Sequence, residues 1–357
     1  MENVLSGAAM GAALTAAGVY QPAVILAQFN FSDFSMLQTF LTAAAGSTLL
    51  VTLSQTLRLT SLPPRPPSSV LGLFRLDGNL VGGALLGTGM AVSGACPGTV
   101  LAQLGVSAGA GGGGTIRSGK YALAGGVLAG WAWSSVLGGR KGGGRARETG
   151  EVLVEGQGQE EGREKEKKEK KKGKAAETVY EALGFSRGAV FIGFEVVCAA
   201  ALVALARYAP SPGGGEKWPV SPVVGGLCMA AAQLVSLVLR RSLLGASTSF
   251  EELGGGIGRL LKGEKFGSYG NVLFSAGVVG GAWLLSTMVP ALGPTREAAI
   301  SPLRAALGGF MIILGSRMAG GCTSGHGISG LSLMSLSSFL TVAATFGAGG
   351  LVGMVMG

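Results

Sequence analysis

Nine stretches of about 20 mostly apolar residues constrain this chain more than any other feature, because about 20 such residues let a helix cross the hydrocarbon core of a bilayer. The sequence therefore predicts an all-α polytopic membrane protein with about nine transmembrane helices. The expected spans are residues 4–28, 35–57, 79–95, 119–138, 187–208, 220–240, 270–291, 303–321 and 333–356.

The composition supports the membrane class. Hydrophobic residues make up 48% of the chain and charged residues only 13%, whereas soluble domains carry about 25% charged residues. The 65 glycines follow no G-X-Y period, which excludes collagen. Small residues instead allow close packing of membrane helices. The N-terminus, MENVLSG, has no basic leader region, so we expect the first apolar stretch to be a span and not a cleaved signal peptide.

One segment, residues 139–186, differs sharply from the rest. Residues 139–177 hold twelve Lys or Arg and nine Glu, a composition typical of a disordered, solvated linker. Because many of the basic residues lie in this mixed-charge linker, the net charge of +9 does not indicate nucleic-acid binding. A role in contacting lipid headgroups or in regulation is the alternative. The expected organisation is an N-terminal half at 1–138, a cytoplasmic linker at 139–186, a connecting helix at 187–208 and a C-terminal half at 209–357.

The charges of the short loops predict an orientation. With nine spans, the N-terminus shares a side with loops 58–78 and 241–269 and with the linker. The two short loops on that side, with the helix ends beside them, carry eight Lys or Arg against six on the other side. The positive-inside rule then places the N-terminus in the cytoplasm.

An internal repeat links two glycine-rich motifs, GGALLGTGMAVSGACPGT at 82–99 and GGFMIILGSRMAGGCTSG at 308–325. At an offset of 226 residues, five of eighteen positions match: Gly82 with Gly308, Gly83 with Gly309, Gly89 with Gly315, Gly94 with Gly320, and Cys96 with Cys322. Corresponding spans are five apart, an odd number, so the two halves enter the membrane in opposite directions. This predicts an inverted-topology repeat, as in many transporters.

Each motif ends a short span at a cysteine-containing loop, and a short apolar segment follows. Irregular backbone at membrane depth is tolerated only where protein buries it or where it lines a wet cavity. Glycines let a substrate approach the backbone, helix N-termini favour anions, and a protonated thiol is a soft, weak donor. We therefore expect a path for a soft anion, without metal or cofactor, lined by Cys96, Cys322, Gly94, Pro97, Gly98, Gly321, Thr323, Ser324 and His326.

Three stretches carry a resemblance to a known family. SGACPG at 93–98, GCTSGHG at 321–327 and RRSLLGAS at 240–247 resemble the signature regions of the YeeE/YedE family of sulphur transporters. The resemblance implies an hourglass-shaped bundle of inverted halves whose short helices meet at a narrow waist. It also implies that thiosulfate passes along cysteine thiols by S–H···S hydrogen bonds, with Cys96 and Cys322 as two relay residues.

The chain departs from the bacterial members of that family at two places. They carry a further cysteine in the first span, whereas the matching stretch here is AAGVYQPAV at 16–24; Tyr20 or Gln21 would supply a neutral donor instead. The charged linker between the halves resembles a eukaryotic-type member, which implies the plasma membrane. Thiosulfate or a similar sulfur anion, the bilayer and a cytoplasmic sulfur-handling protein are the expected partners.

Several residues leave alternatives open at this stage. His326 either contacts the anion or supports its loop. Arg317 and Glu195 are charges within spans, which by default indicate function, but structural pairing is the alternative. Cys198 and Cys228 are expected to be packing residues. We expect a transporter and not an enzyme. The alternatives are a membrane thiol oxidoreductase using Cys96 and Cys322, or a non-transporting scaffold.

Overall fold

The computed structural model describes residues 1–60, 62–109, 118–137, 177–209, 218–267, 269–294, 298 and 300–356. Within these ranges the chain is helical, and the only β contact is an isolated bridge between Thr178 and Ser335. Among the described residues, six helices are long and apolar enough to cross a membrane. The prediction of a polytopic helical membrane protein is confirmed at this level, and the count of nine spans stays a prediction.

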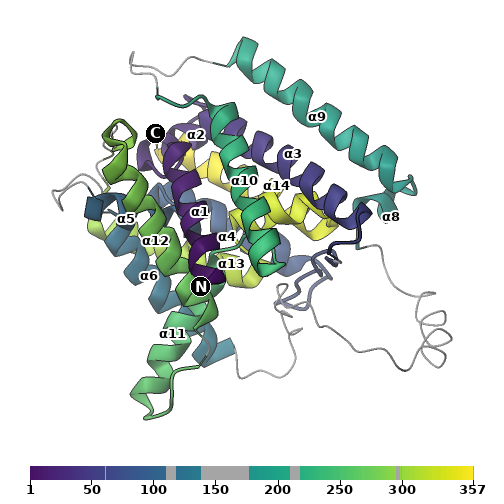
Figure 1. Cartoon of the computed structure of the whole chain (residues 1–357). Coiled ribbons are helices and arrows are strands. Elements are labelled where there is room, and N and C mark those ends of the chain that lie inside the picture. The colour runs from purple at the N-terminus through teal and green to yellow at the C-terminus, as the bar shows by residue number, and fades with distance from the viewer. Residues whose placement is uncertain are drawn as a thin grey trace.

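The N-terminal half contains six α-helices, coloured purple to blue in Figure 1. The first cysteine-bearing motif, at 82–99, begins on helix α4, which packs in the centre of the molecule. The elements are α1 (Glu2–Ala16), α2 (Pro22–Phe29), α3 (Ser35–Thr56), α4 (Asp77–Ser93), α5 (Pro97–Gly109), α6 (Ser118–Ala132) and the π-helix η1 (Trp133–Leu137).

The remainder of the chain is coloured teal to yellow (Figure 1). Most of the linker predicted at 139–186 lies outside the described residues, and its last part includes α8. The elements are α8 (Val179–Leu183), α9 (Arg187–Tyr208), α10 (Pro222–Arg240), α11 (Ser247–Leu261), α12 (Gly270–Met288), η2 (Pro290–Leu292), α13 (Pro302–Ala319), η3 (Gly325–Gly330) and α14 (Leu336–Met356).

Residues 4–28 were expected to form one span, but they form two helices. The chain breaks after α1, where Gly18 has a φ of 70°. A Cβ on Gly18 would lie 2.6 Å from the ring of Trp218, and the Trp218 indole N–H donates to the Ala16 carbonyl at 2.9 Å. The indole thus satisfies a carbonyl at the end of α1, and Pro22 then starts α2 because proline suits the first helical position.

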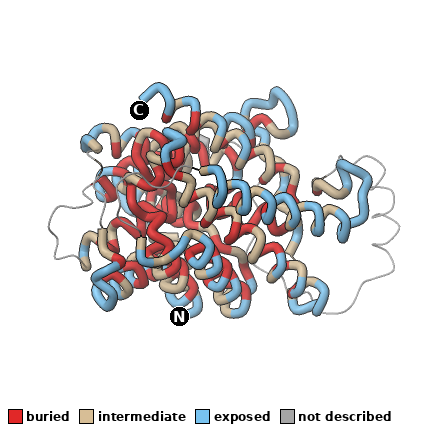
Figure 2. Tube along the Cα trace, turned by 90° about the horizontal axis from the view of Figure 1, so that it is seen from above, coloured by how far each residue is buried: buried red, intermediate tan, exposed pale blue. Residues whose placement is uncertain are grey.

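Helices α4 and α13 cross in the centre of the bundle. Helix α6 packs on α13 and α14 packs on α4, while α1 packs on α12 and α3 on α10. Burial is concentrated in this central region (Figure 2). The crossing is very close because glycines face each other: a Cβ on Gly82 would lie 2.6 Å from the Gly315 carbonyl oxygen, and one on Gly308 would lie 2.9 Å from that of Gly89.

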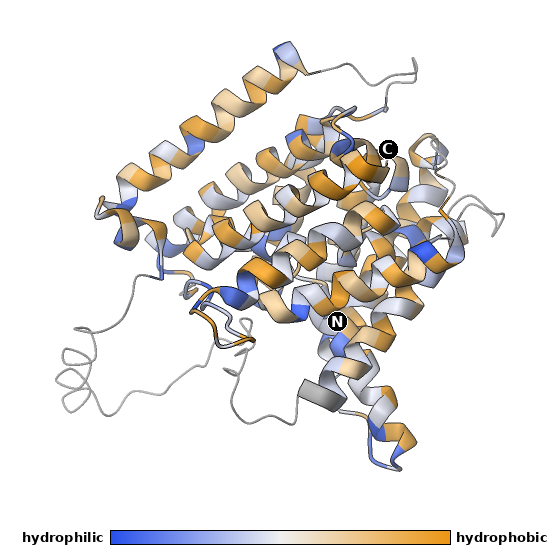
Figure 3. Ribbon diagram, turned by 180° about the vertical axis from the view of Figure 1, so that it is seen from behind, coloured by the Kyte–Doolittle hydropathy of each residue, from blue (hydrophilic) through white to orange (hydrophobic). Residues whose placement is uncertain are grey.

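Helix α9 lies along the outside of the bundle (Figures 1 and 3). It packs mainly on α3, and Cys198 is its only buried residue. Its exposed side chains are mostly apolar (Figure 3). A helix of this length and apolarity is able to cross a membrane, and its role as the connecting helix stays a prediction.

The close glycine crossing makes a prediction about stability. Gly315→Ala would push a methyl group against the backbone of Gly82 and Leu86, so we expect a loss of about 1–3 kcal/mol or more. Gly347→Ala is the matched control, because nothing lies within 4 Å of its Cβ position. Thermal unfolding in detergent measures both, and equal melting temperatures would contradict the role of the crossing.

Candidate functional site: the two cysteine loops

The first cysteine loop joins α4 to α5. Helix α4 ends at Gly94, whose φ of 60° only glycine adopts easily, and α5 begins at Pro97. The Thr99 hydroxyl accepts from the Cys96 N–H at 2.6 Å, and the Thr99 N–H lies 3.5 Å from Cys96 Sγ. The thiol therefore occupies the capping position of α5, against the partial positive charge of its N-terminus.

The break between α1 and α2 lies against this loop. The Gln103 amide donates to the carbonyls of Tyr20 at 2.9 Å and Gly94 at 3.2 Å, which ties the two irregular segments together. The Tyr20 hydroxyl donates to the Leu292 carbonyl at 2.9 Å. Both Tyr20 and Gln21 are buried. Tyr20 and its neighbour Gln21 therefore lie beside the Cys96 loop, and the Tyr20 hydroxyl is bonded to the backbone of η2. Their role as donors stays a prediction.

The second cysteine loop follows α13, which ends at Gly320 with a φ of 79°. A helical stretch of residues 323–332 then begins, with the π-helix η3 in its middle. The Cys322 carbonyl accepts from the His326 N–H at 2.8 Å, and Cys322 Sγ lies 3.3 Å from the Ser324 hydroxyl. This cysteine therefore also stands immediately before the N-terminus of a short helix.

A second helix N-terminus faces the same thiol. Helix α11 begins at Ser247 and lacks a side-chain cap. The backbone N–H groups of Ala246, Ser247 and Gly325 face Cys322. The stretch RRSLLGAS at 240–247, noted in the sequence, therefore ends at the Cys322 loop. Converging N–H groups of this kind attract negative charge.

The two loops lie near each other at the crossing of α4 and α13. The Thr323 hydroxyl donates to Met90 Sδ at 3.2 Å, which joins the second loop to the helix that carries the first. Cys96 and Cys322 belong to the two loops that this contact brings together. Both are buried, with exposed fractions of 8% and 1%. Two thiols and several backbone donors are thus collected in a protein interior.

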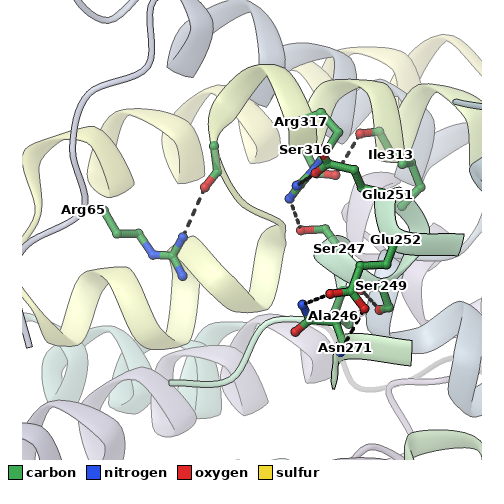
Figure 4. A network of polar contacts seen from close by, with 11 residues as sticks. Arg65, Ala246, Ser247, Ser249, Glu251, Glu252, Asn271, Ile313, Ser316 and Arg317 are labelled. Carbon is green, nitrogen blue, oxygen red and sulfur yellow. Dashed lines mark hydrogen bonds and ion pairs between the residues drawn. The ribbon is translucent and has the colours of Figure 1, made fainter. Parts of the chain in front are cut away.

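Arg317, a charge within a predicted span, has partners in the structure. Its guanidinium forms an ion pair with Glu251 and donates to the Ser247 hydroxyl at 2.9 Å (Figure 4). These contacts tie α13 to the first turn of α11. Arg317 therefore fixes the N-terminus of α11 beside Cys322, and Glu251 balances its charge.

Arg65 is the residue that sequence reasoning missed. It was counted only as a loop charge, but its guanidinium reaches the second loop and donates to the Gly320 carbonyl at 3.3 Å (Figure 4). Gly321 lies between Arg65 and His326. If Gly321 carried a Cβ, that atom would lie 2.7 Å from Arg65 Nη1 and 2.9 Å from His326 Nε2. The sequence feature that could have pointed to Arg65 is the stretch PPRPP at 63–67. Prolines restrict the backbone and hold a residue between them in an extended segment.

The other candidates lie elsewhere or in packed positions. Glu195 and Cys198 are on α9, and Cys228 is on α10. The Oε1 atom of Glu195 is buried without a hydrogen-bond partner among the described residues. Among all the residues that the structure describes, no three His, Cys, Asp or Glu side chains lie close enough together to hold a metal ion. The chemistry at the loops is therefore that of thiols, hydroxyls, backbone donors and arginine.

Apolar helices packed around two buried, interrupted segments define a multi-pass membrane protein of the transporter class. The chain belongs to the sulphur transport family, whose family model matches residues 17–352. It is also 32% identical over 128 residues to a protein named a probable transporter in Xylella fastidiosa strain Temecula1, and 31% identical to its counterpart in strain 9a5c. Each alignment covers 36% of this chain and 86% of the relative.

The contacts of Thr99 make a prediction about the first loop. Thr99→Val removes the hydroxyl that accepts from the Cys96 N–H, so we expect a loss of about 1 kcal/mol in stability and slower transport. Thr99→Ser keeps the hydroxyl and should behave as wild type. Melting temperature and uptake rate test this, and a fully active Thr99→Val protein would contradict the role given to the cap.

The pairing of Arg317 makes a second prediction. Glu251→Gln leaves a nearly buried guanidinium without its counter-charge, so we expect a loss of about 1–3 kcal/mol. The double variant Arg317→Gln and Glu251→Gln should recover part of that loss, because no charge is left unbalanced. A melting temperature that falls further in the double variant than in Glu251→Gln would show that Arg317 has a separate role.

Proposed function

We propose that this protein carries thiosulfate, or a related sulfur-containing anion, across the membrane through the region between Cys96 and Cys322. The observation that carries the proposal is the matched placement of the two thiols, each buried before the N-terminus of a short helix. Protonated thiols offer S–H donors to a soft terminal sulfur atom. Backbone N–H groups and helix dipoles stabilise the anion at both thiols.

An inverted repeat, in which spans one to four correspond to six to nine, is the architecture we propose for this path. The helix packing supports it, since α1 packs on α12 as α10 packs on α3, and α14 packs on α4 as α6 packs on α13. The glycine contacts support it too. At the offset of 226, the pair Gly82 and Gly315 maps onto the pair Gly308 and Gly89, and both pairs are in close contact.

The relatives support the same architecture. The matched 128 residues are 86% of each relative's length but only 36% of this chain, as expected if one half of this chain corresponds to a shorter whole protein. With the orientation proposed from loop charges, the linker, Arg65 and the Cys322 loop face the cytoplasm of a plasma-membrane protein. Cys96, with Tyr20 beside it, then faces the outside.

Growth on thiosulfate tests the proposal. A cell that lacks its own uptake routes should grow on thiosulfate as sole sulfur source when it expresses this protein. Cys96→Ala and Cys322→Ala should each abolish growth, because each removes an S–H donor from the path. Cys228→Ala, a half-buried cysteine on α10 outside the two loops, is the control and should grow. Failure of well-expressed wild-type protein would refute thiosulfate transport, and growth of both loop variants would refute the thiol relay.

A further inference from the structure

We propose that Arg65 and His326, with Cys322, form a binding subsite for a doubly charged oxyanion with a terminal sulfur atom, at the linker-facing end of the path. The inference rests on the proposed function and adds a charged recognition site to it. It is carried by two side chains from distant parts of the chain whose nitrogen atoms lie beside the same residue, Gly321.

The backbone of Arg65 is held firmly in position. Its N–H donates to the Ser335 hydroxyl at 2.8 Å, and its carbonyl accepts from the Ser337 hydroxyl at 3.0 Å. Nearby, the Ser68 hydroxyl donates to the Met318 carbonyl at 2.6 Å. The segment is therefore fastened to the end of α13 and the start of α14, and the guanidinium is preorganised at the second loop.

The guanidinium is turned toward the thiol and still has donors to spare. A Cβ on Gly325 would lie 3.3 Å from Arg65 Nη2 and 3.5 Å from Cys322 Sγ, so the two groups flank the same glycine. One guanidinium nitrogen donates to the Gly320 carbonyl. The buried Nε of Arg65 has no hydrogen-bond partner among the described residues. A planar fork with unused donors suits an oxyanion.

The local charge is unbalanced. Arg317 is paired with Glu251, whereas no carboxylate pairs with Arg65 in the described part of the chain. An unpaired positive charge beside a buried loop is costly. A bound anion would remove that cost, so the site is suited to a ligand that brings negative charge.

His326 supplies a second donor to the same space. The ring is 1% exposed, and its Nδ1 lies 3.0 Å from the Ser338 hydroxyl. Its Nε2 lies near the Ala319 carbonyl but makes no hydrogen bond within the described residues. When Ser338 donates to Nδ1, the neutral ring carries its proton on Nε2, which lies 2.9 Å from the position that a Cβ on Gly321 would take.

The three groups match two ends of one ligand. Oxygen atoms of the anion would accept from the Arg65 guanidinium and from His326 Nε2–H, while the terminal sulfur would accept from the Cys322 thiol. Sulfate would keep the first two contacts and lose the third.

The first loop has no histidine at the matching position, because Val100 stands where His326 stands in the second loop. The proposed subsite therefore belongs to one end of the path.

Binding to the purified protein tests the subsite. Titration calorimetry in detergent would measure the Kd of thiosulfate and of sulfate for wild type, Arg65→Gln, Arg65→Lys and His326→Gln. We expect Arg65→Gln to weaken thiosulfate binding about tenfold or more, since a charged hydrogen bond is lost, and Arg65→Lys to weaken it less. Arg75→Gln removes an exposed charge from the same segment and should bind as wild type.

The outcomes separate this inference from the proposed function. Wild-type transport of thiosulfate with unchanged binding by Arg65→Gln would overturn the subsite and leave the function intact. If Arg65→Gln does not fold, an unchanged Kd in Arg65→Lys would overturn it equally. If wild type neither binds nor transports thiosulfate, the proposed function fails. In that case, wild-type binding of sulfate or sulfite that becomes weaker in Arg65→Gln would still support an oxyanion site. If wild type binds neither anion, or if Arg65→Gln binds them as well as wild type does, the oxyanion site is overturned too.

Discussion

The structure depends on one constraint: backbone that leaves the helix inside a membrane must find its hydrogen bonds within the protein. Both cysteine loops meet this constraint in the same way. A left-handed glycine ends a central helix, and side chains such as Gln103 and Ser329 satisfy neighbouring backbone carbonyls. The close glycine crossing of α4 and α13 brings the two interrupted segments into one buried region. Every functional inference follows from this placement.

Charge in the buried region is distributed unevenly. Arg317 is matched by Glu251 and serves to hold the N-terminus of α11 against the second loop. Arg65 comes from an irregular segment and faces Cys322 without a carboxylate among the described residues. The path that we propose, lined by neutral thiols and backbone donors, would bind anions weakly, which suits passage. In the same proposal, the charged Arg65 at one end adds selectivity where the anion enters or leaves.

Much of this arrangement could be predicted from the sequence. Apolar length predicted the membrane class, and the recurrence of glycines with Cys96 and Cys322 singled out both loops. The break of the first span was missed, because Trp218 stabilises it from a distant segment and no local pattern reports that contact. Arg65 was missed for the same physical reason: its position depends on bonds to Ser335 and Ser337, about 270 residues away. Sequence periodicity describes local helices and not such long-range contacts.

The central claim is that buried thiols carry a soft anion through the bilayer. Uptake of radiolabelled thiosulfate into liposomes containing the purified protein tests it most directly. The account predicts saturable uptake, and unlabelled thiosulfate should suppress it far better than sulfate does. Cys322→Ala should abolish this uptake, and Cys228→Ala should preserve it. Uptake that proceeds equally in Cys322→Ala, or that sulfate suppresses as well as thiosulfate does, would contradict the account.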